Sequence, residues 1–409
     1  METSVEASPK HLSPMLERLR ESGTIEVTRR ARQLKAEGRD VLVISGGEPD
    51  FDTPDHIKDA AVAAIRDGFT KYTPTEGTPQ LKAAIIEKLK RDNGIAARPS
   101  EIIVGTGGKQ IIFDALVASV APGDEAVIPR PCWVSYPDIV EMCGGVPVFV
   151  DTERQHGFKI MPEELRRAIT PATRWFIINS PCNPTGAVYS ADELRALADV
   201  LLDHPQVMIL SDDIYEYITF GRARFATLPQ VEPRLRDRTV IVNGMSKGYC
   251  MTGWRLGYGV GPEWLIAAMA RLQGQTTTST SSISQAAAVA ALKGPHGFVA
   301  DNNRAYERRR DLVVARVNAI PGLSCDAPDG AFYVYVDASG VIGRRTPAGQ
   351  PLSNDVEVAR YILEEGGVAV VPGAGFGRSP YFRLCFAYAD SVLEDACARI
   401  ARAIAALRS

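Results

Sequence analysis

The chain has 409 residues, a length that favours two domains sharing one interface. Hydrophobic residues make up 45% of it and charged residues 23%, which excludes a disordered, fibrous or collagen-like protein. Its 46 lysines and arginines against 49 acidic residues give a net charge of −3, so no nucleic-acid partner is expected.

The cysteines and the N-terminal segment indicate where the protein works. Seven cysteines occur without any Cys-x-x-Cys pair, and the five histidines lack metal-ligand spacing, so neither a disulfide framework nor a metal site is predicted. The first twenty residues contain acidic side chains and no apolar core of the kind found in signal peptides. No apolar run approaches the roughly 18 residues of a membrane span. We therefore expect a cytoplasmic protein with no membrane partner.

Short apolar runs alternate with helix-period segments through most of the chain, which indicates an α/β fold. The runs are apolar on both faces, as expected of a parallel sheet covered by helices on each side. The predicted strands are EIIV (101–104), EAVIP (125–129), PVFV (147–150), WFIIN (175–179), VMILSD (207–212) and TVIVNG (239–244).

After residue 300 the pattern changes to that of a smaller α+β domain. We predict a long charged helix at 303–319, in which Arg308, Arg309 and Arg310 form a solvated face. A hairpin-like stretch ending in AFYVYVD (331–337) and a final strand and helix follow.

The segment GMSKGYCMTGWRLG (244–257) directly follows a predicted strand. A lysine at a strand end in apolar, glycine-rich surroundings can have a lowered pKa and act as a Schiff-base nucleophile. Lys247 is therefore a candidate catalytic residue, with an exposed loop lysine as the alternative. Arg255 lies in an otherwise uncharged window and would need an anionic partner, such as a phosphate, if it were buried.

Two further polar segments follow apolar strands. In NSPCNPTG (179–186) the Asn183 side chain can accept and donate hydrogen bonds at the carboxyl end of the sheet, where α/β proteins bind ligands. In SDDIYEYI (211–218) a buried Asp212 would need a cationic or N–H partner, and a pyridinium nitrogen would be one. Each segment also has an interpretation without a ligand. The asparagine segment could be an Asx turn, and the aspartate segment could be a helix N-cap.

The segment VGTGGKQ (104–110) lies between a predicted strand and a helix. Gly107 and Gly108 would let a phosphate approach the backbone N–H groups at the helix N-terminus. The spacing is that of neither a P-loop nor a G-x-G-x-x-G motif, so neither ATP nor NAD is favoured.

Together these segments resemble the pyridoxal-phosphate-dependent class I aminotransferases of fold type I, and within them the bacterial aspartate aminotransferases. From about Ser22 to the C-terminus the motifs follow the family's order. They are GGEPDFDTPDHI, KYTPTEGTPQLKAAI, VGTGGKQIIFDAL, PCWVSYPDIV, NSPCNPTGAVY, SDDIYEYI, MSKGYCMTGWRLGY and YFRLCFAYAD.

The resemblance implies an architecture and an assembly. The fold would be a large α/β domain at 50–295, with a mostly parallel seven-stranded sheet between helices. A smaller α+β domain would comprise 21–49 and 296–409, and an N-terminal arm would comprise 1–20. The chain would form a homodimer with shared active sites and act on small molecules, namely amino acids and 2-oxo acids.

The resemblance also implies roles for cofactor-binding residues. Lys247 would carry pyridoxal 5′-phosphate covalently, and Asp212 would pair with its pyridine nitrogen. Asn183 and Tyr215 would donate hydrogen bonds to its phenolic oxygen. The remaining cofactor contacts would come from Trp133 on the ring, from Gly107, Gly108, Lys109, Ser246 and Arg255 around the phosphate, and from Tyr72 of the neighbouring subunit.

These roles agree with the chemistry of removing the α-proton of an amino acid. The resulting carbanion is stabilised when a protonated pyridine nitrogen, held by a carboxylate such as Asp212, draws electron density into the ring. Lys247 would carry the proton as general base and then as acid. The planar guanidinium of Arg383, helped by Gly47, Trp133 and Asn183, would bind the α-carboxylate.

Three residues bear on substrate choice. In the resembled enzymes a Ser-x-Thr pair and the lysine after the glycine pair hold the distal carboxylate, and this chain has Ser22, Thr24 and Lys109 there. We therefore expect aspartate with 2-oxoglutarate. The alternatives are an aminotransferase for aromatic or neutral amino acids or prephenate, a pyridoxal-phosphate carbon–sulfur lyase, and a non-catalytic aminotransferase-like regulator domain.

Overall fold

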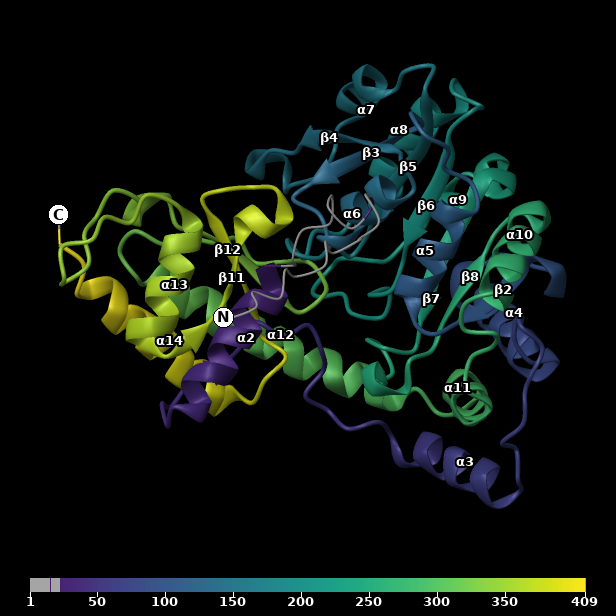
Figure 1. Cartoon of the computed structure of the whole chain (residues 1–409), viewed down its shortest axis with the longest axis horizontal. Coiled ribbons are helices and arrows are strands. Elements are labelled where there is room, and N and C mark those ends of the chain that lie inside the picture. Colours follow the sequence, from purple (N-terminus) through teal and green to yellow (C-terminus); the bar gives the residue numbers. More distant parts are fainter. Residues whose placement is uncertain (1–14, 16–22, 409) are drawn as a thin grey trace, which may run out of the picture.

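The structure is a computed structural model that describes Met15 and residues 23–408, without the side chains of residues 23–26 and 28 (Figure 1). The predicted arm at 1–20 lies, apart from Met15, outside the described residues. The predicted division of the chain into domains stays a prediction.

A seven-stranded sheet forms the larger half of the molecule. Its strand order is β2-β8-β7-β6-β5-β3-β4, and only β8 runs antiparallel to its neighbours. The mostly parallel sheet expected from the apolar runs is therefore confirmed. The strands are β2 (Ile102–Gly105), β3 (Glu125–Arg130), β4 (Val146–Asp151), β5 (Thr173–Asn179), β6 (Met208–Asp212), β7 (Thr239–Gly244) and β8 (Gly257–Val260).

Helices cover both faces of this sheet, and alternate strand residues pack into different layers. On β7, Val240 and Val242 join the cluster formed with α5, α6 and α10, whereas Ile241 joins the cluster formed with α3, α4 and α11. Burial on both faces explains the unbroken apolar runs of the inner strands, whereas β4 at the sheet edge leaves Val146 and Phe149 exposed. The helices are α3 (Asp55–Arg66), α4 (Pro79–Asn93), α5 (Gly108–Val117), α6 (Ser135–Met142), α7 (Pro162–Ala168), α8 (Ala191–Leu202), α9 (Leu228–Val231), α10 (Glu263–Gly274) and α11 (Ser282–Lys293).

A second, three-stranded sheet has the order β11-β12-β9. The predicted hairpin-like stretch is reduced to one antiparallel bridge, between Ser324 and Asp337, because β9 pairs along its length with β12, which lies more than forty residues later in the chain. A parallel pair, β1 with β10, completes this half. The strands are β1 (Leu42–Val43), β9 (Tyr333–Asp337), β10 (Val368–Ala369), β11 (Val371–Pro372) and β12 (Tyr381–Cys385).

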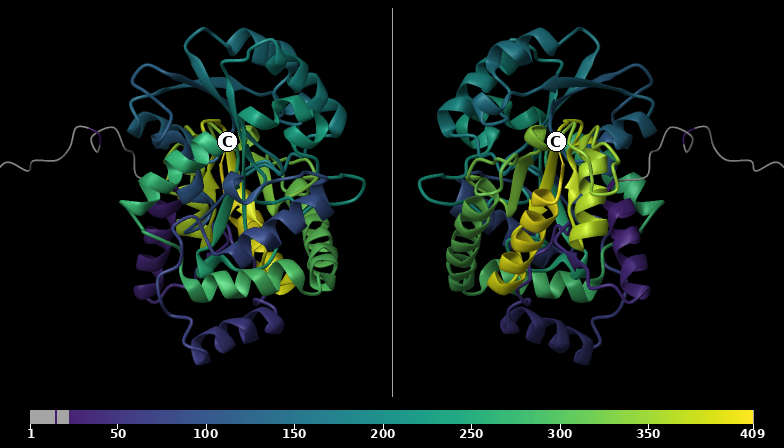
Figure 2. Two further views of the ribbon diagram at one scale, coloured as in Figure 1. Left: turned by 90° about the vertical axis from the view of Figure 1, so that its right-hand side faces the viewer. Right: turned by 90° about the vertical axis from the view of Figure 1, so that its left-hand side faces the viewer.

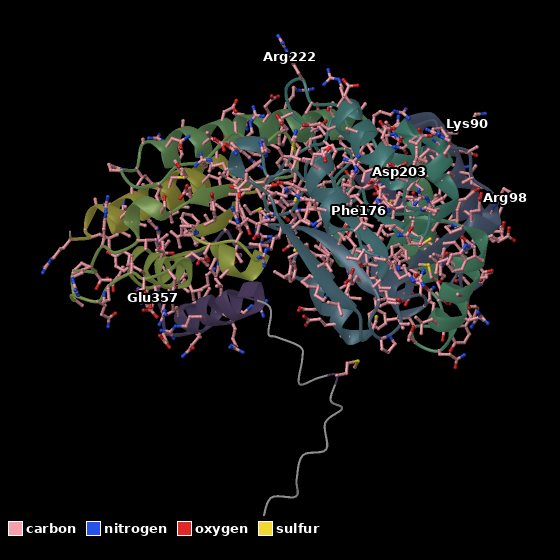
Figure 3. The ribbon with its side chains drawn as sticks, turned by 90° about the horizontal axis from the view of Figure 1, so that it is seen from above. Lys90, Arg98, Phe176, Asp203, Arg222 and Glu357 are labelled. Carbon is pink, nitrogen blue, oxygen red and sulfur yellow. The ribbon has the colours of Figure 1, made fainter. Side chains whose placement is uncertain are left out.

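Four helices pack around the smaller sheet, and α12 and α14 lie side by side (Figure 2). They are α2 (Gly23–Ala36), α12 (Gly297–Asn318), α13 (Asp355–Gly366) and α14 (Asp390–Ala405). Seen from above, Glu357 of α13 lies at the opposite end of the molecule from Lys90 and Arg98, with Phe176 of β5 inside the body (Figure 3). No described helix is both long and apolar enough to cross a membrane.

Arg309 corrects the expectation of a solvated arginine face on α12. Its side chain is only 7% exposed, whereas that of Arg308 is 62% exposed. The guanidinium donates to both carboxylate oxygens of Asp50, at 2.8 and 2.9 Å, and to Asp390 at 3.2 Å. Arg309 therefore ties α12 to the loop before α3 and to the start of α14.

We predict that Arg309→Ala lowers the free energy of unfolding by about 2–3 kcal/mol, because the substitution leaves the partly buried carboxylate of Asp50 without its cation, whereas Asp390 keeps its ion pair with Arg308. Arg308→Ala is the matched control on the same helix and should unfold close to wild type. Urea unfolding followed by circular dichroism measures both, and equal midpoints for the two variants would contradict the role of Arg309.

Candidate active site

A cavity of about 350 Å³ lies at the carboxyl ends of the parallel strands of the large sheet. Strands β5, β6 and β7 end beside one another, so the residues at or just after their ends meet in one place. The cavity is lined by Gly47, Gly108, Lys109, Ile112, Trp133, Val134, Ser135, Tyr136, Asn179, Asn183, Asp212, Ile214, Tyr215, Ser246, Lys247, Arg255, Tyr333 and Arg383.

Asp212 is the buried acid of the cavity. It ends β6 and is 5% exposed. Its carboxylate accepts a hydrogen bond from the Tyr136 hydroxyl at 2.5 Å and one from the backbone N–H of Ile214 at 3.3 Å. Burial raises the pKa of Asp212 to about 6, although the Tyr136 hydrogen bond lowers it. A cation placed against this carboxylate would hold it ionised.

Lys247 lies just beyond the end of β7. Its ammonium group donates to the carbonyl of Gly47. Burial lowers the pKa of the Lys247 amine to about 8, and the nearby positive charge of Arg383 acts in the same direction. A free amine is the nucleophilic form of lysine, so this environment favours covalent chemistry near neutral pH.

An anion-binding arrangement lies at the N-terminus of α5. Gly107 has φ +87°, and a Cβ there would come within 2.6 Å of the Arg255 guanidinium. The positive φ therefore favours glycine, and the absent side chain leaves room for the arginine. Arg255 donates to the carbonyl of Thr252 at 2.9 Å and to that of Thr106 at 3.4 Å, and it lines the cavity. Backbone N–H groups, the helix dipole and a guanidinium thus converge on one point.

Arg383 provides a second, separate cationic group. It lies on β12 and is 3% exposed. Its guanidinium donates to the side-chain oxygen of Asn183 at 2.8 Å and to the carbonyl of Ser45 at 2.7 Å, while its Nε has no partner among the described residues. These bonds leave a planar donor group facing the cavity, which suits a carboxylate.

Asn179 fixes the turn that carries Asn183. Its side-chain amide donates to the carbonyl of Asp212 at 2.8 Å, and its side-chain oxygen accepts from the N–H of Asn183 at 2.8 Å. The ends of β5 and β6 are therefore joined. Because the Asn183 oxygen accepts from Arg383, its NH2 group remains to donate.

The sequence-predicted residues are largely brought together. Apart from Ser22 and Thr24, the predicted site residues line the cavity, with two exceptions. Gly107 lies against Arg255 without lining the cavity, and Tyr72 lies away from it. The Tyr72 side chain is 90% exposed and lies outside the cavity of its own chain. Lys109 is at the rim, with its ammonium 4.8 Å from the centre of the Trp133 ring. Ser22 and the side chain of Thr24 lie outside the described residues.

Sequence reasoning missed two tyrosines. Tyr136 lies one helical turn after Trp133, a spacing that could have placed both on one face. Tyr333 begins β9, and its hydroxyl is 2.7 Å from that of Tyr215. The alternation in AFYVYVD indicates a strand, but no local signal identifies the residue that Tyr333 contacts.

Comparison with known proteins decides the family. The family model for aminotransferase class I and II matches residues 39–400. The chain belongs to this family. The predicted aminotransferase activity and α/β fold of this family are confirmed.

Individual relatives of the aminotransferase are similar over nearly their whole length. This chain is 55% identical to the aspartate/prephenate aminotransferase of Cereibacter sphaeroides, and the match covers 95% of this chain and 97% of the relative. It also matches the crystal structure of aspartate aminotransferase from Rhizobium meliloti, with a TM-score of 0.95, 49% identity and coverage of 98% and 100%. The aspartate aminotransferase of Thermus thermophilus with maleate matches with a TM-score of 0.90, 41% identity and coverage of 97% and 100%.

We predict that Lys247 reacts at lower pH than other lysines. In protein freed of small ligands, its acylation by acetic anhydride should reach half its maximal rate near pH 8, because burial lowers the pKa of its amine to about 8. The internal reference is Lys58, whose pKa is raised by its hydrogen bond to Asp55. Peptide mass spectrometry at graded pH compares the two, and equal midpoints would contradict the lowered pKa.

Proposed function

We propose that this aminotransferase uses pyridoxal 5′-phosphate to move amino groups between dicarboxylic amino acids and 2-oxo acids. The observation that carries the proposal is one cavity with four kinds of group. It holds an amine with a lowered pKa, a buried carboxylate, a helix N-terminus with a guanidinium, and a second buried guanidinium. An aldehyde, a ring nitrogen, a phosphate and a substrate carboxylate are the groups that these four would bind.

The cavity residues fit the cofactor. Lys247 would bind its aldehyde, and Asp212 would face its ring nitrogen. Gly107, Gly108, Ser246 and Arg255 would hold its phosphate, where a Cβ at Gly107 would collide with the guanidinium. Asn183 and Tyr215 would donate to its phenolic oxygen, and Trp133 would lie against its ring. When bound, pyridoxal phosphate supplies an electron sink that stabilises the carbanion left by loss of an α-proton.

The residues of the chain would divide the work of transamination. Arg383 would bind the α-carboxylate and so fix the orientation of the α-hydrogen. Lys247, with a pKa of about 8, would be a free amine often enough to accept that proton from the α-carbon. It would then donate the proton to the C4′ atom of the cofactor. Asp212 would keep the ring nitrogen protonated, and Tyr136 would keep Asp212 ionised by donating to it.

Dicarboxylates are favoured as substrates for two reasons. The cavity has cations at different points, Arg383 on one side and Lys109 at the rim, so a substrate with two carboxylates can meet both. Among the relatives, the Thermus thermophilus structure is described with maleate, a dicarboxylate, and the Cereibacter sphaeroides enzyme is named for aspartate and prephenate. Both named substrates of the latter carry two carboxylates. Ser22 and Thr24 would add to the distal site.

We also propose a homodimer with shared sites in the cytoplasm. Tyr72, which is 90% exposed, would reach the partner's phosphate site. Three apolar side chains near it in the sequence, Val62, Ile65 and Phe69, are 42%, 54% and 41% exposed, and a two-fold interface would cover them. The seven free cysteines support a reducing compartment.

Borohydride trapping tests the cofactor assignment. The protein purified with pyridoxal phosphate should absorb in the visible range, and borohydride should fix the cofactor onto Lys247. Lys247→Ala should lose at least about a hundredfold in transamination, because both the covalent link and the proton carrier are gone. Lys58→Ala, the control, should keep the adduct. Peptide mapping that finds no label, or a label on another lysine, would contradict the assignment.

A substrate panel tests the choice of dicarboxylates. Lys109→Ala should lower kcat/KM for aspartate about 10- to 100-fold while sparing alanine and phenylalanine, because it removes one charge-assisted contact. Arg383→Ala should depress all three. Lys90→Ala, on the outer face of α4, should change none. Equal losses for every substrate in Lys109→Ala would make Lys109 a phosphate-site or structural residue and favour neutral substrates.

A further inference from the structure

Tyr333 lies where three parts of the cavity meet. It is the first residue of β9, is 1% exposed, and lines the cavity. Its hydroxyl approaches Tyr215, its ring face approaches Arg383, and the backbone of Gly47 lies beside it. These neighbours come from segments far apart in the chain, so the position of Tyr333 affects several of them at once.

The hydroxyls of Tyr333 and Tyr215 share one hydrogen bond, in which either oxygen could be the donor. Their oxygens are 2.7 Å apart, and burial raises the pKa of both phenols, so both are neutral at ordinary pH. Among the described residues, the Tyr333 hydroxyl has no hydrogen-bond partner other than Tyr215. If Tyr333 donates, both groups are satisfied and the Tyr215 proton is free to donate into the cavity.

The ring of Tyr333 holds the guanidinium of Arg383. The central carbon of the guanidinium is 4.4 Å from the centre of this ring and 5.0 Å from that of Phe376. Cation–π contact of this kind fixes the plane of an arginine. The hydrogen bonds to Asn183 and to the Ser45 carbonyl then fix its rotation within that plane.

The backbone beside Tyr333 is fitted to its hydroxyl. A Cβ at Gly47 would lie 2.7 Å from the Tyr333 oxygen, so glycine leaves the space that the hydroxyl occupies. The carbonyl of the same glycine accepts from Lys247. The hydroxyl is therefore held in a defined place at the side of the cavity where Lys247 also lies.

We propose that Tyr333 is a positioning residue that aligns the substrate side and the cofactor side of the site together. Its ring orients Arg383 for the α-carboxylate, and its hydroxyl directs the Tyr215 proton toward the phenolic oxygen of the cofactor. The inference rests on the proposed function, which supplies that oxygen and that carboxylate. The titratable and charged groups facing the tyrosine pair are Arg383 and Cys385 of β12, Tyr388 after β12, Asp212 of β6 and Lys247 after β7.

Two substitutions at Tyr333 separate its ring from its hydroxyl. Tyr333→Phe keeps the ring and removes one donor, and Tyr333→Leu removes both. Tyr335→Phe is the matched control, because Tyr335 lies on the same strand and its hydroxyl donates at 2.9 Å to the backbone carbonyl of Arg378 rather than to a cavity residue. Each purified holoenzyme is titrated with pH while its visible absorbance is recorded, and KM is measured for aspartate and alanine.

We expect Tyr333→Phe to raise the pH midpoint of the absorbance change by about half a unit to one unit, because a weaker Tyr215 donor stabilises the phenolate less. Its KM values should stay within about twofold of wild type, since the ring remains. Tyr333→Leu should also raise KM for both amino acids about 3- to 30-fold. Tyr335→Phe should change neither quantity.

The outcomes separate this inference from the proposed function. A midpoint for Tyr333→Phe equal to that of Tyr335→Phe would overturn the directing role of the hydroxyl. Unchanged KM values in Tyr333→Leu would overturn the role of the ring. If Tyr333→Leu fails to fold, the phenylalanine variant still decides the hydroxyl. A wild-type protein without a visible band or a lysine adduct would instead refute the cofactor assignment, and this inference with it.

Discussion

The carboxylate of Asp212 is buried at the end of a central strand, and a buried charge is stable only when donors and cations surround it. Burial raises its pKa to about 6, so without partners it would be partly protonated near neutral pH. The structure supplies Tyr136 and the backbone N–H of Ile214. The remaining requirement is a cation on the cavity side, which the pyridinium of the proposed cofactor would meet. The proposed cofactor and the acid would therefore stabilise each other.

The sheet explains how such a site forms from distant residues. Parallel β5, β6 and β7 end at one edge and deliver Asn179, Asp212 and Lys247 to neighbouring positions. The antiparallel β8 then pairs with both β7 and β2, which brings Arg255, just before β8, against the glycine turn that opens α5. The cavity lining includes four basic side chains, Lys109, Lys247, Arg255 and Arg383, against one buried acid, Asp212. That imbalance favours ligands with more than one negative charge, such as a phosphorylated cofactor together with a carboxylate substrate.

Local sequence patterns predicted those elements of the fold that appear in the sequence as short apolar or periodic runs. Six strands of the large sheet were visible because both of their faces are apolar. The seventh, Gly257–Val260, was missed because two of its four residues are glycine, which has low strand propensity. The pairing of β9 with β12 and the burial of Arg309 depend on contacts between segments far apart in the chain. For the same reason Arg383 was identified only by family resemblance, and Tyr136 and Tyr333 were not identified.

The turn after β6 is also held by buried polar contacts on the side away from the cavity. Glu216, the residue after Tyr215, forms an ion pair with Lys88 of α4, and both are almost fully buried. Asn93 donates to the same carboxylate, and Asn303 of α12 donates to the carbonyl of Tyr217. Helix α4 begins at Pro79, seven residues after Tyr72. A single helix therefore links the turn that carries Tyr215 to the segment that carries Tyr72. The position of Tyr215 therefore depends on a buried charge pair, Lys88 with Glu216, that does not itself line the cavity.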